Sequence, residues 1–344
     1  MNKNHLIVLE FIQGNKLVSR AEISANSALE VSDATIKRII SDLVKENWII
    51  SLGKGKATTY TSAPKLEILF PIDLDTYFLV EQDVRSIKER FDFDIFEKLS
   101  RTTLFTTVEQ NHLSDLQQKF QSKTSELTSL QYQKEMERLA IDLSWKSSQI
   151  EGNTYSLLET EQLLKEKKTA SGKTKDEAVM LLNHKDAIDF LLAQPEYGVN
   201  LSLKLIEELH SLLVKELGIN RNIRKRRVGI TGTNYNPLDN EFEIKEALEK
   251  TCVLVNSRKS IYEKAFLTLV LISYIQPFAD GNKRTSRILS NGILIAENYC
   301  PLSFRTVDPL DYKKAMLVFY EKTNITPMKR LFIEQAEFAV DTYF

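Results

Sequence analysis

Residues 276–287 read Gln-Pro-Phe-Ala-Asp-Gly-Asn-Lys-Arg-Thr-Ser-Arg and connect two apolar runs. The runs, residues 266–275 and 285–296, are long enough for buried helices, and Pro277 ends the first of them. A glycine-containing loop that leads into a helix N-terminus is a natural anion site. Free backbone N–H groups and the positive end of the helix dipole meet there.

Three charged side chains extend this interpretation. Arg284 and Arg287 are three residues apart in the first turn of the second helix, so both guanidinium groups can face one site and bind phosphate oxygens bidentately. Asp280 supplies a hard oxygen ligand of the kind that holds Mg²⁺ beside a polyphosphate. The loop therefore predicts a magnesium-bound nucleotide. The alternative is a helix–turn–helix corner in which Asp280 caps a helix and the arginines are solvated.

The same loop resembles the signature of the Fic (Fic/Doc, Fido) family, HxFx[D/E]GNGRxxR, and the resemblance extends over about residues 95–340. It implies ATP and Mg²⁺ as cofactors and transfer of AMP to a Ser, Thr or Tyr hydroxyl of a protein substrate. It also implies that Asp280 holds the metal. The implied nucleotide-binding residues are Phe278, Asp280, Gly281, Asn282, Lys283, Arg284 and Arg287.

Two positions depart from the signature. Gln276 stands where the family has its catalytic His, and a carboxamide cannot serve as a general base. Lys283 replaces the second glycine of the loop, as it does in Doc-type members, which phosphorylate their targets. Three functions stay open: an autoinhibited adenylyltransferase with weak or lost activity, a non-catalytic nucleotide-responsive DNA-binding regulator, and a Doc-like protein phosphotransferase.

The segment Ser-Ser-Gln-Ile-Glu-Gly-Asn that begins at Ser147 resembles the family's inhibitory helix, [S/T]xxxE[G/N]. The resemblance implies a helix around residues 140–152 in which Glu151 pairs with Arg287 and prevents productive placement of the γ-phosphate. Gly152 would end that helix. The alternative is an ordinary helix C-terminus with a surface glutamate.

Residues 221–227 contain five basic residues in seven and precede an alternating run, residues 228–237. The alternation predicts a strand that leads into a turn. The segment resembles the Fic flap, a β-hairpin that would hold the target protein by β-augmentation. The basic run could instead be a solvated face or a nucleic-acid patch. The implied flap residues are Val228, Ile230, Thr231 and Gly232.

Residues 1–65 predict three helices followed by a hairpin with a basic tip, Gly53-Lys-Gly-Lys56. This order resembles winged helix-turn-helix modules, in which the third helix enters the major groove and the wing contacts phosphates. Nine basic and six acidic residues give the segment a net charge of +3. The alternative is a protein-interaction module or dimerisation arm. The residues implied to contact duplex DNA are Thr35, Lys37, Arg38, Lys54 and Lys56.

The chain of 344 residues exceeds the usual size of one domain. We expect a winged helix-turn-helix module (1–65), a connector (66–95) and a Fic domain (96–344). The expected fold class is mainly α: an all-helical Fic domain with a small β-hairpin flap, preceded by an α+β module.

No apolar run reaches the roughly 18 residues that span a bilayer, so we expect a cytoplasmic protein without membrane contact. Neither the two cysteines nor the four histidines occur at metal-binding spacings. The oligomeric state stays open, with a homodimer among the options.

Overall fold

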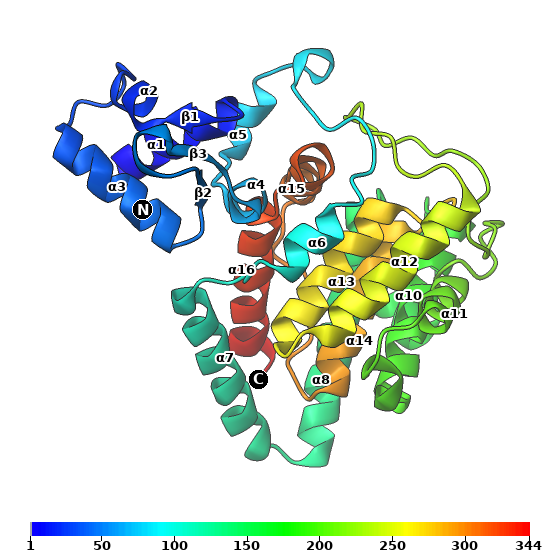
Figure 1. Cartoon of the computed structure of the whole chain (residues 1–344). Helices are drawn as coiled ribbons and strands as arrows, with labels where there is room; N and C mark the ends of the chain where they lie inside the picture. Colours follow the sequence, from blue (N-terminus) through cyan, green and yellow to red (C-terminus); the bar gives the residue numbers. More distant parts are fainter. Residues whose placement is uncertain (1) are drawn as a thin grey trace.

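The computed structural model describes residues 2–344, and it is mainly helical, with one small sheet near the N-terminus (Figure 1). This confirms the predicted fold class. Figure 1 shows the N-terminal module, residues 2–62, at one side of the molecule and a larger helical domain beside it.

The N-terminal module contains three helices and a three-stranded antiparallel sheet of order β1-β3-β2. Ile49 of β2 faces Ser62 of β3 in the register. A 3-10 turn, η1, precedes β3. The elements are α1 (Lys3–Gly14), β1 (Val18–Ser19), α2 (Arg20–Ser24), α3 (Asp33–Lys45), β2 (Ile49–Leu52), η1 (Gly55–Ala57) and β3 (Thr59–Ser62).

Local sequence signals explain where these helices begin. Ser19 and Glu22 form the predicted capping box at the start of α2. Ser32 accepts a hydrogen bond from the backbone N–H of Thr35 and so caps α3. The apolar face of α3 then packs into the module core through Ile36, Ile39, Ile40 and Leu43, which are all buried.

A connector leads from the module through α4 (Pro64–Leu69), α5 (Leu74–Phe78) and η2 (Gln82–Val84) to α6 (Ile95–Ser100). It is docked on the C-terminal helices rather than free. Asn324 donates hydrogen bonds to the carbonyls of Glu67 and Phe70, and Ile325 N–H donates to Ile68 O. These bonds join segments that are more than 250 residues apart in the sequence.

The helical domain is built around α13, in which every residue from Ala265 to Ile275 is buried. A helix that is apolar on all sides is a core helix. α14 packs along it, and α12 and α15 also contact it. The elements are α7 (Thr107–Ser125), α8 (Ser129–Ile150), α9 (Leu157–Glu166), α10 (Lys175–Ala193), η3 (Pro195–Gly198), α11 (Leu203–Leu213), α12 (Glu241–Ser257), α13 (Ile261–Ile275), α14 (Asn282–Ala296), α15 (Pro309–Lys322) and α16 (Thr326–Tyr343).

The segment predicted as a strand, residues 228–237, is irregular. It turns at Thr231–Gly232, and its one ladder contact is an isolated parallel bridge between Asn236 and Arg90. The paired hairpin predicted at this point does not form. The segment lies against the connector instead, through that bridge, a backbone hydrogen bond from Asn236 N–H to Glu89 O and side-chain contacts of Asn234. We refer to residues 228–236 as the flap.

Candidate functional site

The site lies at the corner between α13 and α14. Gln276 ends α13 in the left-handed conformation (φ 51°), and Gly281, also left-handed (φ 82°), precedes α14. No side chain caps the N-terminus of α14. The first backbone N–H groups of that helix consequently have no intrahelical partner, which is the geometry of an anion site.

Asn282 fixes the shape of the loop. Its Oδ1 accepts from Phe278 N–H at 2.8 Å, and its Nδ2 donates to Phe278 O at 2.9 Å. The same Nδ2 also donates to Gln276 Oε1 at 3.0 Å. The Asn282 side chain thus holds the loop together from within.

Gln276 is buried and bonded at both ends of its carboxamide. Besides accepting from Asn282, it donates through Nε2 to Ser273 O at 2.7 Å. Its backbone carbonyl accepts from Arg224 Nε at 2.6 Å. The residue at the position of the family's histidine therefore serves the loop structure, and it has no group that can accept a proton.

Two arginines lie under the loop. Arg284 is 2% exposed and contacts Asp280 at 3.4 Å, while its Nε and Nη1 have no partner among the described residues. Arg287 is fully buried, and its Nη1 is likewise unpaired there. Leaving a buried donor unsatisfied costs on the order of 1–3 kcal/mol, more for charged groups. Anionic oxygens would remove that cost.

Glu151, immediately after α8, binds two cations of the loop helix. Its Oε1 is 2.8 Å from Arg287 Nη2, and its Oε2 is 3.2 Å from Lys283 Nζ. Burial tends to raise the pKa of Glu151, but Arg287 and Lys283 outweigh it and hold the pKa below its usual range. The carboxylate is therefore ionised and occupies the position of an anion.

Ser147, one turn earlier on α8, supports the same arginine. Arg287 donates through Nε to Ser147 Oγ at 2.8 Å and through Nη2 to Ser147 O at 2.9 Å. The hydroxyl is also 2.7 Å from His184 Nε2. Burial, followed by the charge of Arg287, lowers the pKa of His184 well below its ordinary value, so the neutral ring can accept the Ser147 proton.

A cavity of about 460 Å³ opens above the loop, within the size range of small-molecule sites. The loop and α8 form one side, and the flap and α15 form the other. Among the predicted site residues, those that line the cavity are Glu151, Gly152, Val228, Ile230, Thr231, Gln276, Asp280, Gly281, Asn282 and Lys283.

Five of the residues predicted for the catalytic, nucleotide-binding, inhibitory and flap positions do not line this cavity. Arg284, Arg287 and Ser147 lie beneath it, and Gly232 lies at the outer end of the flap turn. Phe278 was expected to contact the nucleotide, but it is fully buried and stacks on His210 with the ring centroids 3.6 Å apart. An aromatic ring between two apolar helices is more stable in the core than facing a polar pocket.

The sequence interpretation missed side chains that come from distant elements. Met316 and Leu317 of α15 line the apolar side of the cavity beside Tyr320. Arg224 donates to the carbonyls of Gln276 and Ile275 and so fixes the end of α13. The basic run that contains Arg224 was noted, but nothing in its pattern distinguishes the one arginine that turns inward.

A metal ion at this site would need ligands from a bound nucleotide as well as from the protein. The carboxylate of Asp280 is 66% exposed at the rim of the cavity. Among residues 2–344 no cluster of three acidic, His or Cys side chains could hold a metal. Mg²⁺ suits such a site, because it is commonly bound through one carboxylate together with phosphates and water.

The predicted DNA-contacting residues lie on the N-terminal module, away from this cavity. Lys37, Arg38 and Lys54 are exposed, and Thr35 is half-buried beside the cap of α3. The side chain of Lys56 lies outside the part of the chain that the structure describes.

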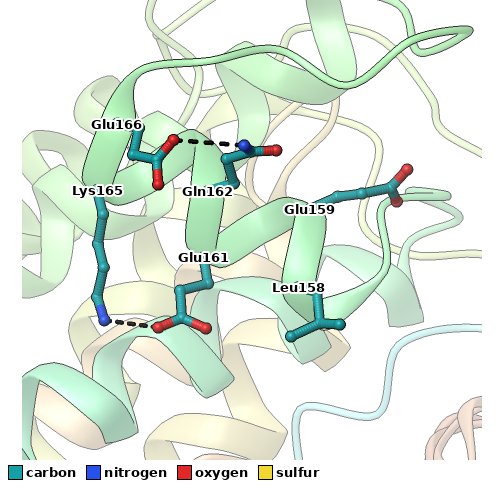
Figure 2. A pocket seen from close by; sticks show the side chains of 6 residues that line it. All are labelled: Leu158, Glu159, Glu161, Gln162, Lys165 and Glu166. Carbon is teal, nitrogen blue, oxygen red and sulfur yellow. Dashed lines mark hydrogen bonds and ion pairs between the residues drawn. The ribbon is translucent and has the colours of Figure 1, made fainter.

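Figure 2 shows a second depression, on the surface of α9. Its charged groups pair with each other: Lys165 with Glu161 at 2.6 Å and Gln162 with Glu166 at 3.3 Å. We interpret it as a solvated helix face, since pairs four residues apart stabilise exposed helices in this way. None of the described helices is long and apolar enough to cross a membrane.

The fold and the site define a helical domain in which two buried arginines lie beside the loop that joins two core helices. The model of the Fic/DOC family matches residues 200–294, which run from the start of α11 into α14. The chain therefore contains a Fic/DOC family domain.

Curated relatives agree at modest identity. The chain is 27% identical over 202 residues to protein adenylyltransferase Fic of Drosophila virilis and 26% identical to that of Drosophila melanogaster. Each match covers 56% of this chain and 40% of the relative. The chain thus spans well under half the length of the curated relatives it matches.

Solved structures share the fold. Fic-1 of C. elegans (residues 134–508) aligns with a TM-score of 0.60 at 20% identity, covering 69% of this chain and 72% of that one. A Fic family protein from Desulfovibrio desulfuricans aligns with a TM-score of 0.55 at 18% identity, covering 69% and 74%.

We predict that His210 makes the stability of the domain depend on pH. Burial lowers the pKa of His210 to about 4, against about 6.5 in an unfolded chain. The unfolded chain therefore binds more protons between these values. The contribution of neutral His210 is complete above about pH 6.5 and is lost as the pH falls toward 4.

His210→Gln should flatten this dependence, which urea unfolding between pH 4.5 and 7.5 would measure. The slope that remains comes in part from His184, whose pKa burial also lowers. If the free energy of unfolding depends on pH as steeply in the variant as in the wild type, His210 is not a source of the pH dependence.

Proposed function

We propose that this chain is a Fic-type protein adenylyltransferase held in an inhibited state, with Gln276 limiting its basal activity. The observation that carries the proposal is the pair of buried arginines under the uncapped N-terminus of α14. Their unpartnered N–H groups suit the phosphates of ATP. The adenylyltransferase activity of the Drosophila relatives supports the same chemistry.

In this proposal Asp280 holds Mg²⁺, and the N-terminus of α14, with Arg284 and Arg287, binds the phosphates. The hydroxyl oxygen of a Ser, Thr or Tyr in a target protein would attack the α-phosphorus of ATP, so that AMP is bonded to the target and pyrophosphate leaves. The attacking hydroxyl must lose its proton, and Gln276 cannot take it. The basal rate of AMP transfer should then be roughly 10²–10⁴-fold lower than that of an enzyme with a general base at this position.

Glu151 provides the inhibition. It satisfies Arg287 and Lys283 together, so a γ-phosphate must compete with a carboxylate that is already bound to both. Charge-assisted hydrogen bonds are worth about 1.5–3 kcal/mol each, which makes this competition substantial. Lys283 is thereby paired with Glu151 in the resting state. In a Doc-like phosphotransferase, too, this ion pair would have to break before Lys283 could bind a phosphate.

A second candidate function is a nucleotide-responsive regulator without catalysis. It is favoured by Gln276, whose carboxamide is fully used in the loop, and by the exposed basic side chains of α3. In both readings we infer that residues 1–65 form a winged helix-turn-helix module that binds duplex DNA, with α3 as the groove helix.

We predict that MgATP binds to the wild-type protein and that Arg284→Ala weakens this binding about ten- to a hundredfold. The reason is the loss of one charge-assisted contact to phosphate. Isothermal calorimetry would measure both affinities. Arg330→Ala is the matched control, because Arg330 is an exposed arginine on α16 that pairs with Glu334. Equal affinities of wild type and Arg284→Ala would rule out the phosphate site.

We predict that Gln276→His raises transfer of label from α-labelled ATP by about 10²–10⁴-fold, because histidine restores a base near neutral pKa. Adding Glu151→Gly should raise it further, since that change frees Arg287 without affecting proton transfer. The assay uses Mg²⁺ and a lysate of the source organism. Label from γ-labelled ATP instead would indicate phosphorylation.

No transfer from either label by the double variant, with ATP binding intact, would favour the regulator. Lys283→Gly in the same background would then test whether that lysine has changed the chemistry. The three substitutions separate three causes of low activity. Gln276→His tests the missing general base, Glu151→Gly tests the inhibition, and Lys283→Gly tests altered placement of the phosphates.

We predict that the protein shifts duplex DNA in a mobility assay and that the affinity falls steeply with salt, since phosphate contacts release counterions. Lys37→Ala combined with Arg38→Ala should weaken binding and reduce the salt slope by about two. Lys250→Ala, on α12 of the helical domain, is the control. No shift at low salt with a folded module would indicate a protein-interaction role.

A further inference from the structure

The connector runs alongside the flap and contacts it at alternate residues. Asn236 N–H donates to Glu89 O at 2.8 Å. The carboxamide of Asn234 is held at both ends, by Gln82 Nε2 at 2.7 Å and by Asp83 Oδ1 at 3.0 Å. The connector therefore takes the place that a paired strand has in a hairpin.

Arg85 makes the third contact and joins three segments. Its Nη2 donates to Gly232 O at 2.6 Å, at the flap turn. Its Nε and Nη2 also bind the two carboxylate oxygens of Glu321, at 3.1 and 3.0 Å. The Arg85 side chain is 6% exposed and that of Glu321 is fully buried. Glu321 follows Tyr320, which lines the cavity, so one guanidinium links the connector, the flap turn and α15.

Tyr235 anchors the C-terminal end of the flap, because its buried side chain donates to Tyr274 O at 3.2 Å and stacks on Tyr274 and Tyr320. The turn has fewer contacts. Within the described part of the chain, no backbone–backbone hydrogen bond joins residues 228–234 to another segment. Gly232 is in the left-handed region at φ 96°, which glycine adopts without strain, so the turn depends on support from other segments. Arg85 gives that support through a charge-assisted bond to a carbonyl, the stronger class of hydrogen bond.

We propose that Arg85 is a positioning residue that fixes the flap turn over the cavity, so that the docked connector determines the conformation of the flap. The assignment of the flap to target binding rests on the proposed function, but the positioning by Arg85 does not. Because the connector leads directly from the N-terminal module, displacing it would release the flap.

Limited trypsin digestion of the full chain tests this. Residues 225–227 are exposed and basic, whereas Val228 and Ile230, which follow them, are half-buried. A protease must hold the residues on both sides of the bond in an extended conformation, so cleavage between Arg227 and Val228 is faster when the start of the flap leaves the surface. When opening is fast, the cleavage rate follows the population of the open form. Mass spectrometry of the fragments would give the rate at this bond. Thermal unfolding and MgATP calorimetry would run in parallel.

Arg85→Met should speed this cleavage about ten- to a hundredfold, the expected effect of losing a charge-assisted bond. Arg85→Lys should partly restore protection, because its ammonium can take the place of Nη2. Asn234→Ala should speed cleavage about tenfold, and it leaves the ion pair of Glu321 intact. This variant tests the role of the connector in holding the flap even if Arg85→Met does not fold. Tyr77→Phe is the control, since it removes the hydroxyl bound to Glu321 at 2.6 Å and leaves the flap contacts intact.

The proposal is overturned if Arg85→Met and Asn234→Ala are cut at the wild-type rate, or if Tyr77→Phe accelerates cleavage equally. If Tyr77→Phe accelerates cleavage equally, then the contacts of Glu321 affect cleavage through the overall stability of the domain, and not through the position of the flap turn. Failure of MgATP to bind would count against the proposed function and leave the flap result standing.

Discussion

The arrangement of the site follows from one electrostatic conflict, the burial of Arg284 and Arg287 beside the positive end of α14. Like charges, a helix dipole of the same sign and loss of water all oppose this placement. Asp280 and Glu151 offset part of the conflict, and the ring of Tyr312, 5.1 Å from the Arg287 guanidinium, offsets a little more. The remaining unsatisfied donors explain why an anion belongs here.

The same electrostatic conflict applies whether Glu151 or a phosphate group lies beside the two cations of the site. Glu151 is stable in its position because two cations surround it, and those cations are tolerated because Glu151 is there. In the proposed function, a polyphosphate would compete with this carboxylate for the same two cations. Inhibition of that kind would follow from charge balance, without a movement of α8 as a whole.

Some of this could be predicted from the sequence. The anion loop was recognisable because Asp280, Gly281 and the two arginines lie within eight residues, where local spacing fixes geometry. Most of the contribution of α15 was not recognisable, because Met316 and Leu317 look like core residues in their own helix.

The errors have the same origin. An alternating pattern indicated strands at residues 228–237, but that segment lies against the connector, with which it forms one isolated bridge and side-chain contacts instead of a ladder. Phe278 was assigned to the nucleotide by its position in the signature. Its packing against His210, some seventy residues away, decided otherwise. Patterns within one element do not reveal which distant element will cover it.

The docking of the connector on α15 and α16 also has a consequence for synthesis. Glu67 and Phe70 leave the ribosome long before Asn324, their hydrogen-bonding partner, has been translated. The N-terminal module can pack its helices and sheet early, whereas the connector must wait until Asn324 has been translated. During that interval the cavity lacks the side formed by α15. Vectorial translation therefore delays assembly of the complete cavity until α15 has left the ribosome.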